Sequence, residues 1–222
     1  MPHPDAPSLV LPPPPAAGRV WVAFSGGLDS TVLLHRLAQD LVVRRQGLHA
    51  IHVHHGLQPD ADAWAAHCEA QCLSLEVPLQ VRRVRVDMAA GDGVEAAARR
   101  ARHAALRETM QAGDIIALAH HRDDQAETFL LRALRASGPE GLAAMRPWRA
   151  FGTGWLWRPL LDTPRSTLES YARAASLSWI EDPSNAATAF DRNFLRHEVL
   201  PLLRARWPHA DAAFARSAAL NA

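Results

Sequence analysis

The chain carries two stretches whose residue types and spacing suit chemistry, and the first is Ser25-Gly26-Gly27-Leu28-Asp29-Ser30, followed by Thr31. It comes after the apolar residues 20–24 and before a segment with apolar residues at helical spacing. Adjacent glycines allow a tight turn and a close approach of the backbone to a ligand. The N–H groups and the dipole at a helix start attract anions. The order strand, glycine turn, helix predicts a phosphate-binding loop; the alternative is an ordinary turn in which Asp and Ser cap the helix.

Asp29 lies where bound phosphates would lie, and a carboxylate there would repel them unless Mg²⁺ bridges it to the phosphate oxygens. The hydroxyl groups of Ser25, Ser30 and Thr31 can add further contacts. All 24 basic residues are arginine, because the chain contains no lysine. This excludes a Walker-type loop, which needs a lysine on the phosphates, and Schiff-base chemistry. We therefore expect backbone N–H groups and one Mg²⁺ ion at Asp29 to hold a pyrophosphate group.

The second stretch is His120-His121-Arg122-Asp123-Asp124-Gln125-Ala126-Glu127, which follows the apolar residues 114–119. Asp124 and Glu127 are three residues apart at the start of an expected helix, so they share one face. A substrate amine arrives as an ammonium ion and must lose a proton before it can attack. Two carboxylates in a crevice can bind such an amine and accept its proton. The alternative is that these acids only complement the helix dipole.

Two further groups of residues leave alternatives open. His52, His54 and His55 can flank a base or ribose, or they can be ordinary strand and turn residues. Arg99 and Arg102 lie on one face of an expected alanine-rich helix. Either they face the crevice and stabilise developing phosphate charge, or they form solvated pairs along the helix.

Strands that alternate with helices predict an α/β fold, a doubly wound, mostly parallel sheet with helices on both faces. The expected strands are residues 20–24, 48–54, 79–86 and 114–119, and the expected helices are residues 28–45, 60–76, 94–110, a segment from about 122, and 164–175. Ligands bind beyond the carboxyl ends of the strands in such sheets. The glycine turn and residues 52–57, 86–92 and 120–127 should therefore meet at one edge.

The composition divides the chain into three parts. Residues 1–18 are rich in proline and are expected to form a disordered tail without core material. Residues 19–185 are expected to form the catalytic domain, and residues 186–222 a helical linker. Cys68 and Cys72 fall in a helical apolar pattern and are expected to be buried thiols.

The remaining composition bears on location and partners. No apolar run approaches a membrane span, and no signal peptide is recognised, which predicts a cytoplasmic protein. The net charge of +1 gives no support for nucleic-acid binding as a bulk property. Any contact with RNA must therefore come from a local arginine patch.

The glycine turn resembles the PP-loop of the ATP-pyrophosphatases, which have an adenine nucleotide alpha-hydrolase-like fold. A series of further motifs, in order, is similar to the tRNA(Ile)-lysidine synthases over residues 20–203. These motifs are Val53-His54-His55-Gly56-Leu57, residues 95–102, residues 119–128, Leu130-Leu131-Arg132, Arg158-Pro159-Leu160-Leu161, Glu181-Asp182-Pro183-Ser184-Asn185 and Arg192-Asn193.

This resemblance implies a reaction and a set of site residues. ATP would bind at residues 25–31 and His54, with Mg²⁺ held partly by Asp29. The wobble cytidine in the anticodon loop of tRNA(Ile) would be adenylated, and L-lysine would then displace AMP to leave lysidine. Asp124, Glu127 and either Arg99 or Arg102 match the residues associated with lysine and the transition state. The oligomeric state is left open, with a homodimer as one candidate.

The chain departs from the family pattern in two places. Ala136-Ser137-Gly138 replaces the usual Gly-Ser-Gly, and family members usually continue into further tRNA-binding domains beyond the equivalent of Ala222. An isolated catalytic domain is therefore expected. One alternative is a PP-loop thiolase, which commonly uses a Cys-x-x-Cys pair or an iron–sulfur cluster, unlike the spacing of Cys68 and Cys72. Another is a non-catalytic module that binds ATP or tRNA.

Overall fold

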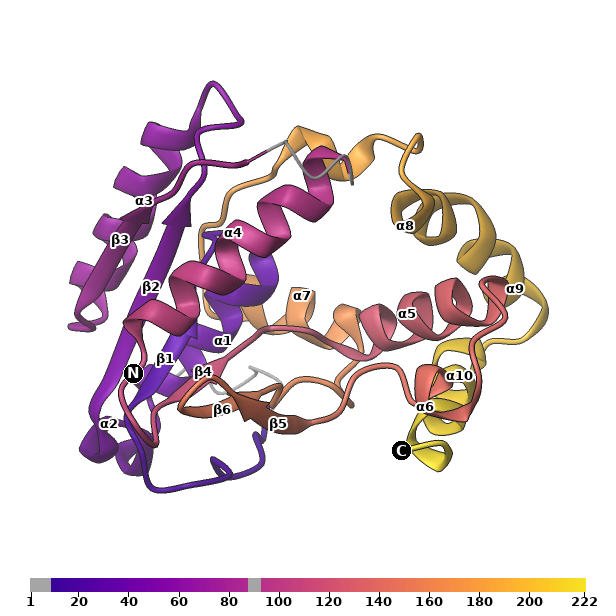
Figure 1. The fold of residues 1–222 in the computed structure, drawn as a ribbon, viewed down its shortest axis with the longest axis horizontal. Coiled ribbons are helices and arrows are strands. Elements are labelled where there is room, and N and C mark those ends of the chain that lie inside the picture. The colour runs from indigo at the N-terminus through magenta and orange to yellow at the C-terminus, as the bar shows by residue number, and fades with distance from the viewer. Residues whose placement is uncertain (1–8, 88–92) are drawn as a thin grey trace.

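The computed structural model describes residues 9–87 and 93–222, which fold around one six-stranded sheet (Figure 1). Its strand order is β3-β2-β1-β4-β6-β5. The first five strands in this order are parallel, and β5 runs antiparallel to β6 at the edge. The strands are β1 (Val20–Ala23), β2 (Leu48–His54), β3 (Leu79–Arg83), β4 (Ile115–Ala117), β5 (Trp148–Phe151) and β6 (Gly154–Trp157). The predicted mostly parallel sheet is confirmed.

The helices follow the predicted alternation and then continue to the C-terminus. They are α1 (Leu28–Ala38), α2 (Leu41–Gly47), α3 (Ala61–Ser74), α4 (Val94–Thr109), α5 (Arg122–Leu134), α6 (Pro139–Leu142), α7 (Arg165–Ala174), the 3-10 turn η1 (Pro183–Ala186), α8 (Asp191–Phe194), the π-helix η2 (Leu195–Val199), α9 (Leu200–Arg206) and α10 (Ala210–Leu220). No helix in the described ranges has the length and apolar character needed to span a bilayer.

The expectation of a single helix over residues 28–45 is wrong. Helix α1 ends at Ala38, and α2 begins at Leu41 with Asp40 as its N-cap. The Asp40 carboxylate accepts the backbone N–H groups of Val42 and Val43 at 2.9 and 3.2 Å. A side chain that caps these amides starts a new helix at low cost. The break is therefore explained by a local capping contact.

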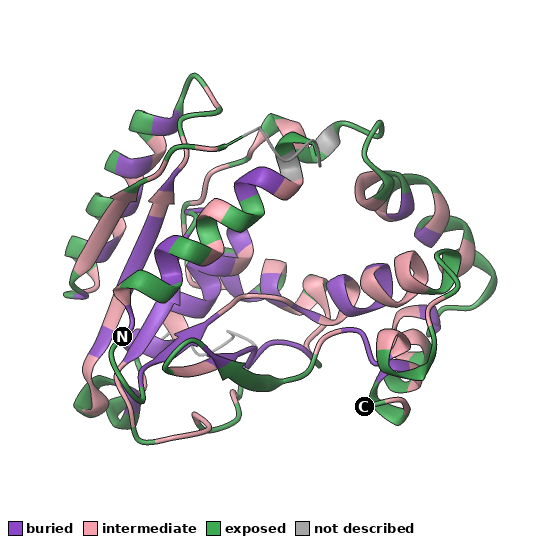
Figure 2. Ribbon diagram, viewed as in Figure 1, coloured by how far each residue is buried: buried purple, intermediate pink, exposed green. Residues whose placement is uncertain are grey.

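Two apolar clusters lie on opposite faces of the sheet, and buried residues concentrate on the strands and on the helix sides that face them (Figure 2). The larger cluster packs α1, α3 and α7 against one face through residues such as Leu33, Cys68 and Leu168. The smaller cluster packs Leu106 of α4 against Ile51 and Ile116 on the other face. Helices therefore cover both faces, as predicted.

The N-terminal tail contributes to the core, contrary to the expectation for residues 1–18. Leu9 is 4% exposed and lies in the larger cluster. Its carbonyl oxygen accepts a hydrogen bond from Arg36 Nε at 2.7 Å, which holds this part of the chain against α1. The expectation of no core material is wrong at Leu9, and residues 1–8 lie outside the described residues.

The C-terminal segment is helical, as predicted, and it packs on α5. The rings of Phe129 on α5 and Phe214 on α10 stack with their centroids 5.7 Å apart. In Figure 1 the yellow C-terminal helices lie beside α5, at the end of the molecule away from β3. This docking is what brings residues of α8 and η2 to the start of α5.

Asp114, directly before β4, joins three parts of the chain through a nearly buried carboxylate. It accepts hydrogen bonds from Arg19 Nη2 at 2.8 Å, Trp21 Nε1 at 3.2 Å and the Gln111 amide at 2.9 Å. Burial alone would raise the pKa of Asp114, but Arg19 and the other donors outweigh it and hold the pKa below its ordinary value. The ionised carboxylate therefore stabilises the start of β4.

Replacing Asp114 with asparagine is expected to lower the free energy of unfolding by about 2–3 kcal/mol at neutral pH. A carboxyl group with a lowered pKa stabilises the folded state above its unfolded pKa of about 3.9, and this contribution disappears as the pH falls through the folded pKa. Urea unfolding at neutral and acid pH should show the difference between wild type and variant shrinking below pH of about 4. Asp162→Asn on the exposed surface is the control, and a pH-independent difference would contradict the assignment.

Candidate active site

The glycine turn and the start of α5 are neighbours because of the strand order. Strand β1 pairs with β2 on one side and with β4 on the other. The chain leaves β1 toward β2 and β3, and it places β4 and β6 on the opposite side. The order reverses at β1, and this is the point where open parallel sheets bind ligands. The two sequence stretches predicted to carry chemistry therefore share one crevice edge.

The glycine turn is held by the segment that precedes the motif at residues 181–185. Gly26 has φ +82°, and a Cβ atom there would lie 2.6 Å from Ile180 Cδ1. The Gly26 carbonyl accepts the Ile180 amide at 2.9 Å, and Gly27 forms a parallel bridge with Ile180. The positive φ favours glycine at position 26, and a larger residue there would also have to displace the end of the Ile180 side chain.

The hydroxyl groups of the turn mostly bind the turn itself. Ser30 Oγ donates to the Gly27 carbonyl at 3.0 Å, and Thr31 Oγ1 donates to the Gly26 carbonyl at 3.2 Å. Ser30 and Thr31 are buried, whereas Ser25 is exposed and its Oγ lies 3.0 Å from Ser30 Oγ. We predicted that the hydroxyls of Ser30 and Thr31 contact phosphate. In the structure they donate to carbonyl groups of the turn instead. Leu28, also part of the predicted loop, is buried.

Asp29, in the first turn of α1, has one carboxylate oxygen without a partner. Its Oδ1 atom is buried and accepts no hydrogen bond in the described part of the chain. The nearest cations are Arg165 Nε, 3.9 Å from Oδ1, and His121 Nε2, 3.6 Å from Oδ2. A buried oxygen without a partner is costly, so a bound group is expected to satisfy it.

The donor set around Asp29 fits a Mg²⁺ ion held together with phosphates. Mg²⁺ prefers oxygen ligands and often takes only one or two carboxylates, with substrate phosphates and water completing its shell. Among residues 9–87 and 93–222, no group of three His, Cys, Asp or Glu side chains could hold a metal ion. A protein cage is therefore not the arrangement that these residues offer.

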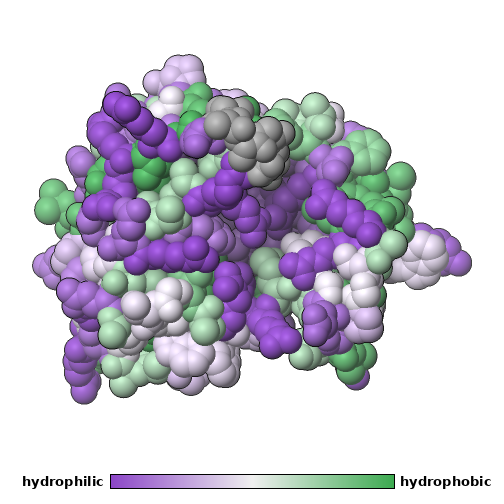
Figure 3. All heavy atoms as spheres, in the orientation of Figure 1, coloured by the Kyte–Doolittle hydropathy of each residue, from purple (hydrophilic) through white to green (hydrophobic). Residues whose placement is uncertain are grey.

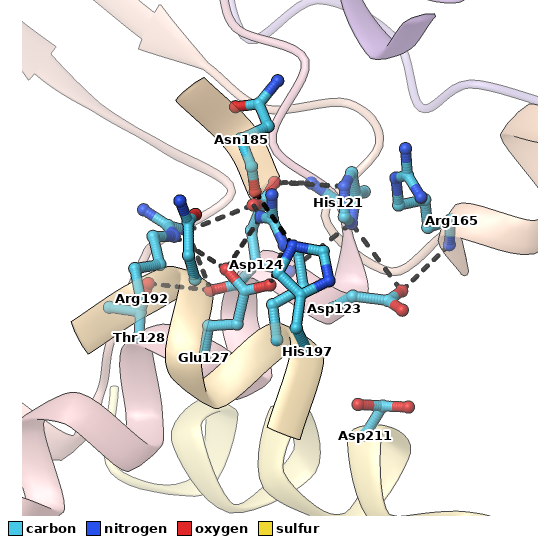
Figure 4. Close-up of polar contacts among 12 residues, drawn as sticks. His121, Asp123, Asp124, Glu127, Thr128, Arg165, Asn185, Arg192, His197 and Asp211 are labelled. Atoms are coloured by element: carbon cyan, nitrogen blue, oxygen red, sulfur yellow. Dashed lines mark hydrogen bonds and ion pairs between the residues drawn. The ribbon is translucent and has the colours of Figure 1, made fainter. Parts of the chain in front are cut away.

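His121 lies beside Asp123 and Asp124 at the start of α5 (Figure 4), and its Nε2 lies 3.6 Å from Asp29 Oδ2 in the first turn of α1. Its backbone amide donates to Asp124 Oδ2 at 3.0 Å as part of a capping box, and its Nδ1 lies 3.7 Å from Asp123 Oδ2. Burial opposes protonation, but the carboxylates of Asp123, Asp29 and Asp124 outweigh it and raise the pKa of His121 to about 10. His121 was not predicted as a site residue, although the acids two and three positions later were an available signal.

Asp124 and Glu127 share one face of α5, as predicted, but two arginines already pair with them (Figure 4). Glu127 is fully buried, and its Oε1 and Oε2 accept Arg196 Nε at 2.6 Å and Arg192 Nε at 2.7 Å. Asp124 Oδ1 accepts Arg192 Nη2 at 3.1 Å and Arg196 Nη2 at 3.3 Å. We call these four residues the acid–arginine cluster.

The acid–arginine cluster corrects the expectation of two open carboxylates. Burial would raise the pKa of Asp124, but the charges of His121 and Arg192 outweigh it, so the pKa is lowered. Asp124 is therefore ionised, and both acids pair with Arg192 and Arg196 in this structure. The physical reason is that α8 and η2 fold back over the start of α5.

The other predicted site residues lie on β2 and α4. His54 is buried, and its Nε2 lies 3.2 Å from Asp62 Oδ1 and 3.3 Å from Arg83 Nη1, at the α3 and β3 side. Arg99 and Arg102 are exposed on α4. The Arg99 charge contributes to the low pKa of His120, and the Arg102 charge contributes to that of His55, so both lie within electrostatic range of strand ends. Residues 88–92, also expected at this edge, and the Glu95 side chain lie outside what the structure describes.

Arg158 and His120 form a pair that sequence reasoning missed as site residues. Arg158 is buried, and its Nε donates to His120 Nδ1 at 3.2 Å while Nη1 donates to the Arg146 carbonyl at 2.7 Å. Burial, helped by neighbouring arginines, lowers the pKa of Arg158 to about 10, and burial lowers that of His120 to about 3. His120 is therefore neutral, with its proton on Nε2. From the sequence, Arg158 was named only within the motif Arg158-Pro159-Leu160-Leu161.

Comparisons with known proteins identify the family of this chain. The model of a PP-loop domain family matches residues 8–203. This chain belongs to the PP-loop domain family. The predicted family is thereby confirmed, and its members are ATP-binding proteins.

The PP-loop domain is similar to curated proteins over nearly its whole length. It is 62% identical over 216 residues to a tRNA(Ile)-lysidine synthase of Xanthomonas axonopodis pv. citri (strain 306), covering 97% of this chain and 48% of the relative. It is 58% identical over 201 residues to a tRNA(Ile)-lysidine synthase of Pseudomonas fluorescens (strain Pf0-1), covering 89% of this chain and 45% of the relative. The chain spans about half the length of the curated relatives it matches.

A solved structure supports the fold. It is the U34-tRNA thiolase NcsA from Methanococcus maripaludis with its 4Fe-4S cluster, with a TM-score of 0.69 and 15% identity. The similarity covers 91% of this chain and 72% of that chain. At this identity the likeness confirms the PP-loop fold alone.

Proposed function

We propose that this PP-loop domain is the catalytic part of a tRNA(Ile)-lysidine synthase. In this proposal it joins L-lysine to the 2-position of the wobble cytidine of tRNA(Ile), with ATP as the activating nucleotide. The observation that carries the proposal is 62% identity to a lysidine synthase across 97% of the chain. The meeting of a phosphate-binding turn and an acidic helix start at one crevice edge supports it.

The first step activates the base. The cytidine 2-oxygen attacks the α-phosphorus of ATP, and the bond to pyrophosphate breaks. The N–H groups at the start of α1 bind the leaving pyrophosphate, and Asp29 is the residue that would hold Mg²⁺. A bound Mg²⁺ ion would neutralise phosphate charge. Arg158 presents a buried guanidinium with no carboxylate within ion-pair distance among the described residues, so an anionic phosphate can pair with it.

The second step forms the C–N bond. The lysine amine attacks carbon 2 of the cytidine, the bond to the adenylate oxygen breaks, and AMP leaves. The Asp124 side chain is 11% exposed and Glu127 is 0% exposed, so Asp124 is the carboxylate that an ammonium ion can reach. We assign the amine contact to Asp124, with one arginine contact exchanged on binding. Glu127 then positions Arg192 and Arg196.

The thiolase alternative is less supported. Burial raises the pKa of Cys68 and of Cys72 to about 12, so both thiols are protonated at neutral pH. Cluster ligands and nucleophiles are thiolates.

A cytoplasmic location and a homodimer stay predictions.

Release of AMP tests the proposed function. The chain is incubated with ATP and Mg²⁺, with tRNA(Ile) and lysine added singly or together. We expect pyrophosphate release with tRNA(Ile) alone, and AMP release with lysidine in the tRNA when both are present. ATP binding without AMP release under every combination would contradict the enzyme and favour a non-catalytic ATP- or tRNA-binding module.

A further inference from the structure

Helix α4 carries basic residues along one exposed stripe. Residues four apart lie on one face of a helix. The stripe borders an open hollow along α4, lined by Ala96, Arg99, Arg100, His103, Ala104 and Arg107. Figure 3 shows hydrophilic side chains gathered over this part of the molecule. The stripe lies outside the glycine turn and the acid–arginine cluster.

Strand β5 lies next to the stripe through Phe151, whose ring contacts residues of α4. The Arg107 guanidinium carbon lies 4.9 Å from the centre of the Phe151 ring, and that of Arg149 lies 5.5 Å from the same centre. The His103 ring meets Phe151 edge-on, with centroids 5.7 Å apart. One aromatic ring therefore gathers two arginines and a histidine. We call Arg99, His103, Arg107 and Arg149 the α4 groove.

The positive charge of the α4 groove is not neutralised by carboxylates. Within the described ranges, Arg107 contacts an aromatic ring and Arg149 a ring and a backbone carbonyl, and neither they nor Arg99 form an ion pair. By contrast, Arg82 next to this helix pairs with Glu108 at 2.9 Å. Burial lowers the pKa of His103 to about 4, and the charges of four arginines add to this effect: Arg99, Arg102, Arg149 and Arg107. Like charges held together in a groove attract a polyanion.

The orientation of α4 leads from this groove to the active site. The helix begins after β3 ends and finishes before β4 begins, so its N-terminal end lies at the carboxyl ends of the strands. Arg99 is close enough to His120, at the end of β4, for its charge to lower the pKa of that histidine. Positions 99 and 107 are separated by about 12 Å along the helix. A strand of phosphates along the groove would continue into the crevice.

We propose that the α4 groove binds the phosphodiester backbone of the RNA substrate. This inference rests on the proposed function, because that function supplies an RNA substrate. Guanidinium groups bind phosphate through paired hydrogen bonds. Contacts to the backbone position an RNA without reading its sequence. The α4 groove is thus assigned a positioning role, and recognition of the cytidine stays with the crevice.

The test compares two double variants of the full 222-residue chain. Arg107→Ala with Arg149→Ala removes two charges from the groove. Arg45→Ala with Arg173→Ala removes two exposed charges from α2 and α7, which pack on the other face of the sheet. Binding of a tRNA(Ile) transcript is measured by fluorescence anisotropy between about 50 and 200 mM salt. Thermal unfolding and ATP binding report the fold of each variant.

We expect the groove variant to bind tRNA about tenfold more weakly, with the slope of log affinity against log salt reduced by about 2. The control variant should keep the wild-type slope. Arg107→Lys keeps the charge and should keep most of the salt dependence, which separates charge from packing on Phe151. Equal slopes for both double variants, or no salt-dependent tRNA binding by the wild type, would overturn the proposal.

The same variants separate this proposal from the proposed function. If AMP release by the groove variant keeps the wild-type KM for tRNA, the groove assignment is wrong and the proposed function stands. If the groove variant loses tRNA binding but the wild type releases no AMP, the groove assignment stands and the proposed function is wrong.

Discussion

Replacing Glu127 with glutamine is expected to lower the free energy of unfolding by about 2–4 kcal/mol. Glu127 is fully buried and accepts hydrogen bonds from both Arg192 and Arg196. Glutamine keeps the shape but removes the negative charge, which leaves two guanidinium groups sharing Asp124. Breaking a buried pair by removing one partner is costly because the other charge stays desolvated. The arginines are about a quarter exposed, which keeps the expected loss below that of a fully buried pair.

The effect should be concentrated in the C-terminal helices. Arg192 lies in α8 and Arg196 in η2, so both anchor this segment to α5. We expect trypsin to cut Glu127→Gln faster than wild type between residues 192 and 206, with cleavage within the sheet rising less. Urea unfolding gives the change in free energy, and peptide mapping gives the position of the cuts.

Glu169→Gln is the matched control for Glu127→Gln. Glu169 also pairs with two arginines, Arg165 at 2.8 Å and Arg173 at 3.5 Å, but its side chain is 34% exposed. Exposed pairs contribute about 1 kcal/mol or less. A similar small change for both variants would contradict the role of Glu127 in the acid–arginine cluster.

The two half-reactions separate a structural role from an amine-binding role. If Glu127 positions Arg192 and Arg196, its replacement should slow adenylation and lysine attack to a similar extent. If Glu127 itself binds the amine, adenylation should be spared and only lysine attack should slow. A selective loss with unchanged stability would restore the interpretation reached from spacing alone.

The features predicted from the sequence are those that local patterns control. The run at residues 48–54 predicts β2 with its observed bounds, and the glycine pair predicts the turn before α1. Both depend on neighbours within a few residues. The capping contact at Asp40 is equally local, and the aspartate before Leu41 was an available signal for the break between α1 and α2.

The features that were not predicted depend on residues far apart in the chain. Arg192 and Glu127 are 65 positions apart, and Arg196 and Glu127 are 69. Spacing within residues 120–127 places two acids on one face, but it carries no information on which cations fold over them. The pairing of Arg158 with His120 spans 38 positions and is hidden for the same reason. Sequence reasoning therefore identified two segments that the fold brings together at His121 and Asp29, and left the partners of their charges open.

Replacing Asp29 with alanine is expected to abolish the strengthening of ATP binding by Mg²⁺, a loss of roughly 10–100-fold in affinity when Mg²⁺ is present. Asp29 Oδ1 is buried without a hydrogen-bond partner, which is the observation that points to a bound cation. The first turn of α1 also attracts phosphate, so Asp29 would hold the metal next to the bound nucleotide, where it would neutralise phosphate charge.

The sign of the effect reverses when the metal is absent. Without Mg²⁺, the Asp29 carboxylate repels the phosphates, and its removal leaves the nearby cations Arg165 and His121 facing them. We therefore expect Asp29→Ala to bind metal-free ATP at least as tightly as wild type does. Titration calorimetry with Mg²⁺ and with EDTA measures both affinities.

Asp191→Ala is the control for Asp29→Ala. Asp191 also lies in the first turn of a helix, but its side chain is 77% exposed and pairs with Arg135 at 3.6 Å. Its replacement should leave the response to Mg²⁺ unchanged. If Asp29→Ala keeps the wild-type response, another group holds the metal. In that case Arg165 is the partner of Asp29 Oδ1 in the wild type. If the variant loses affinity equally with and without Mg²⁺, Asp29 shapes the turn and does not act through a metal.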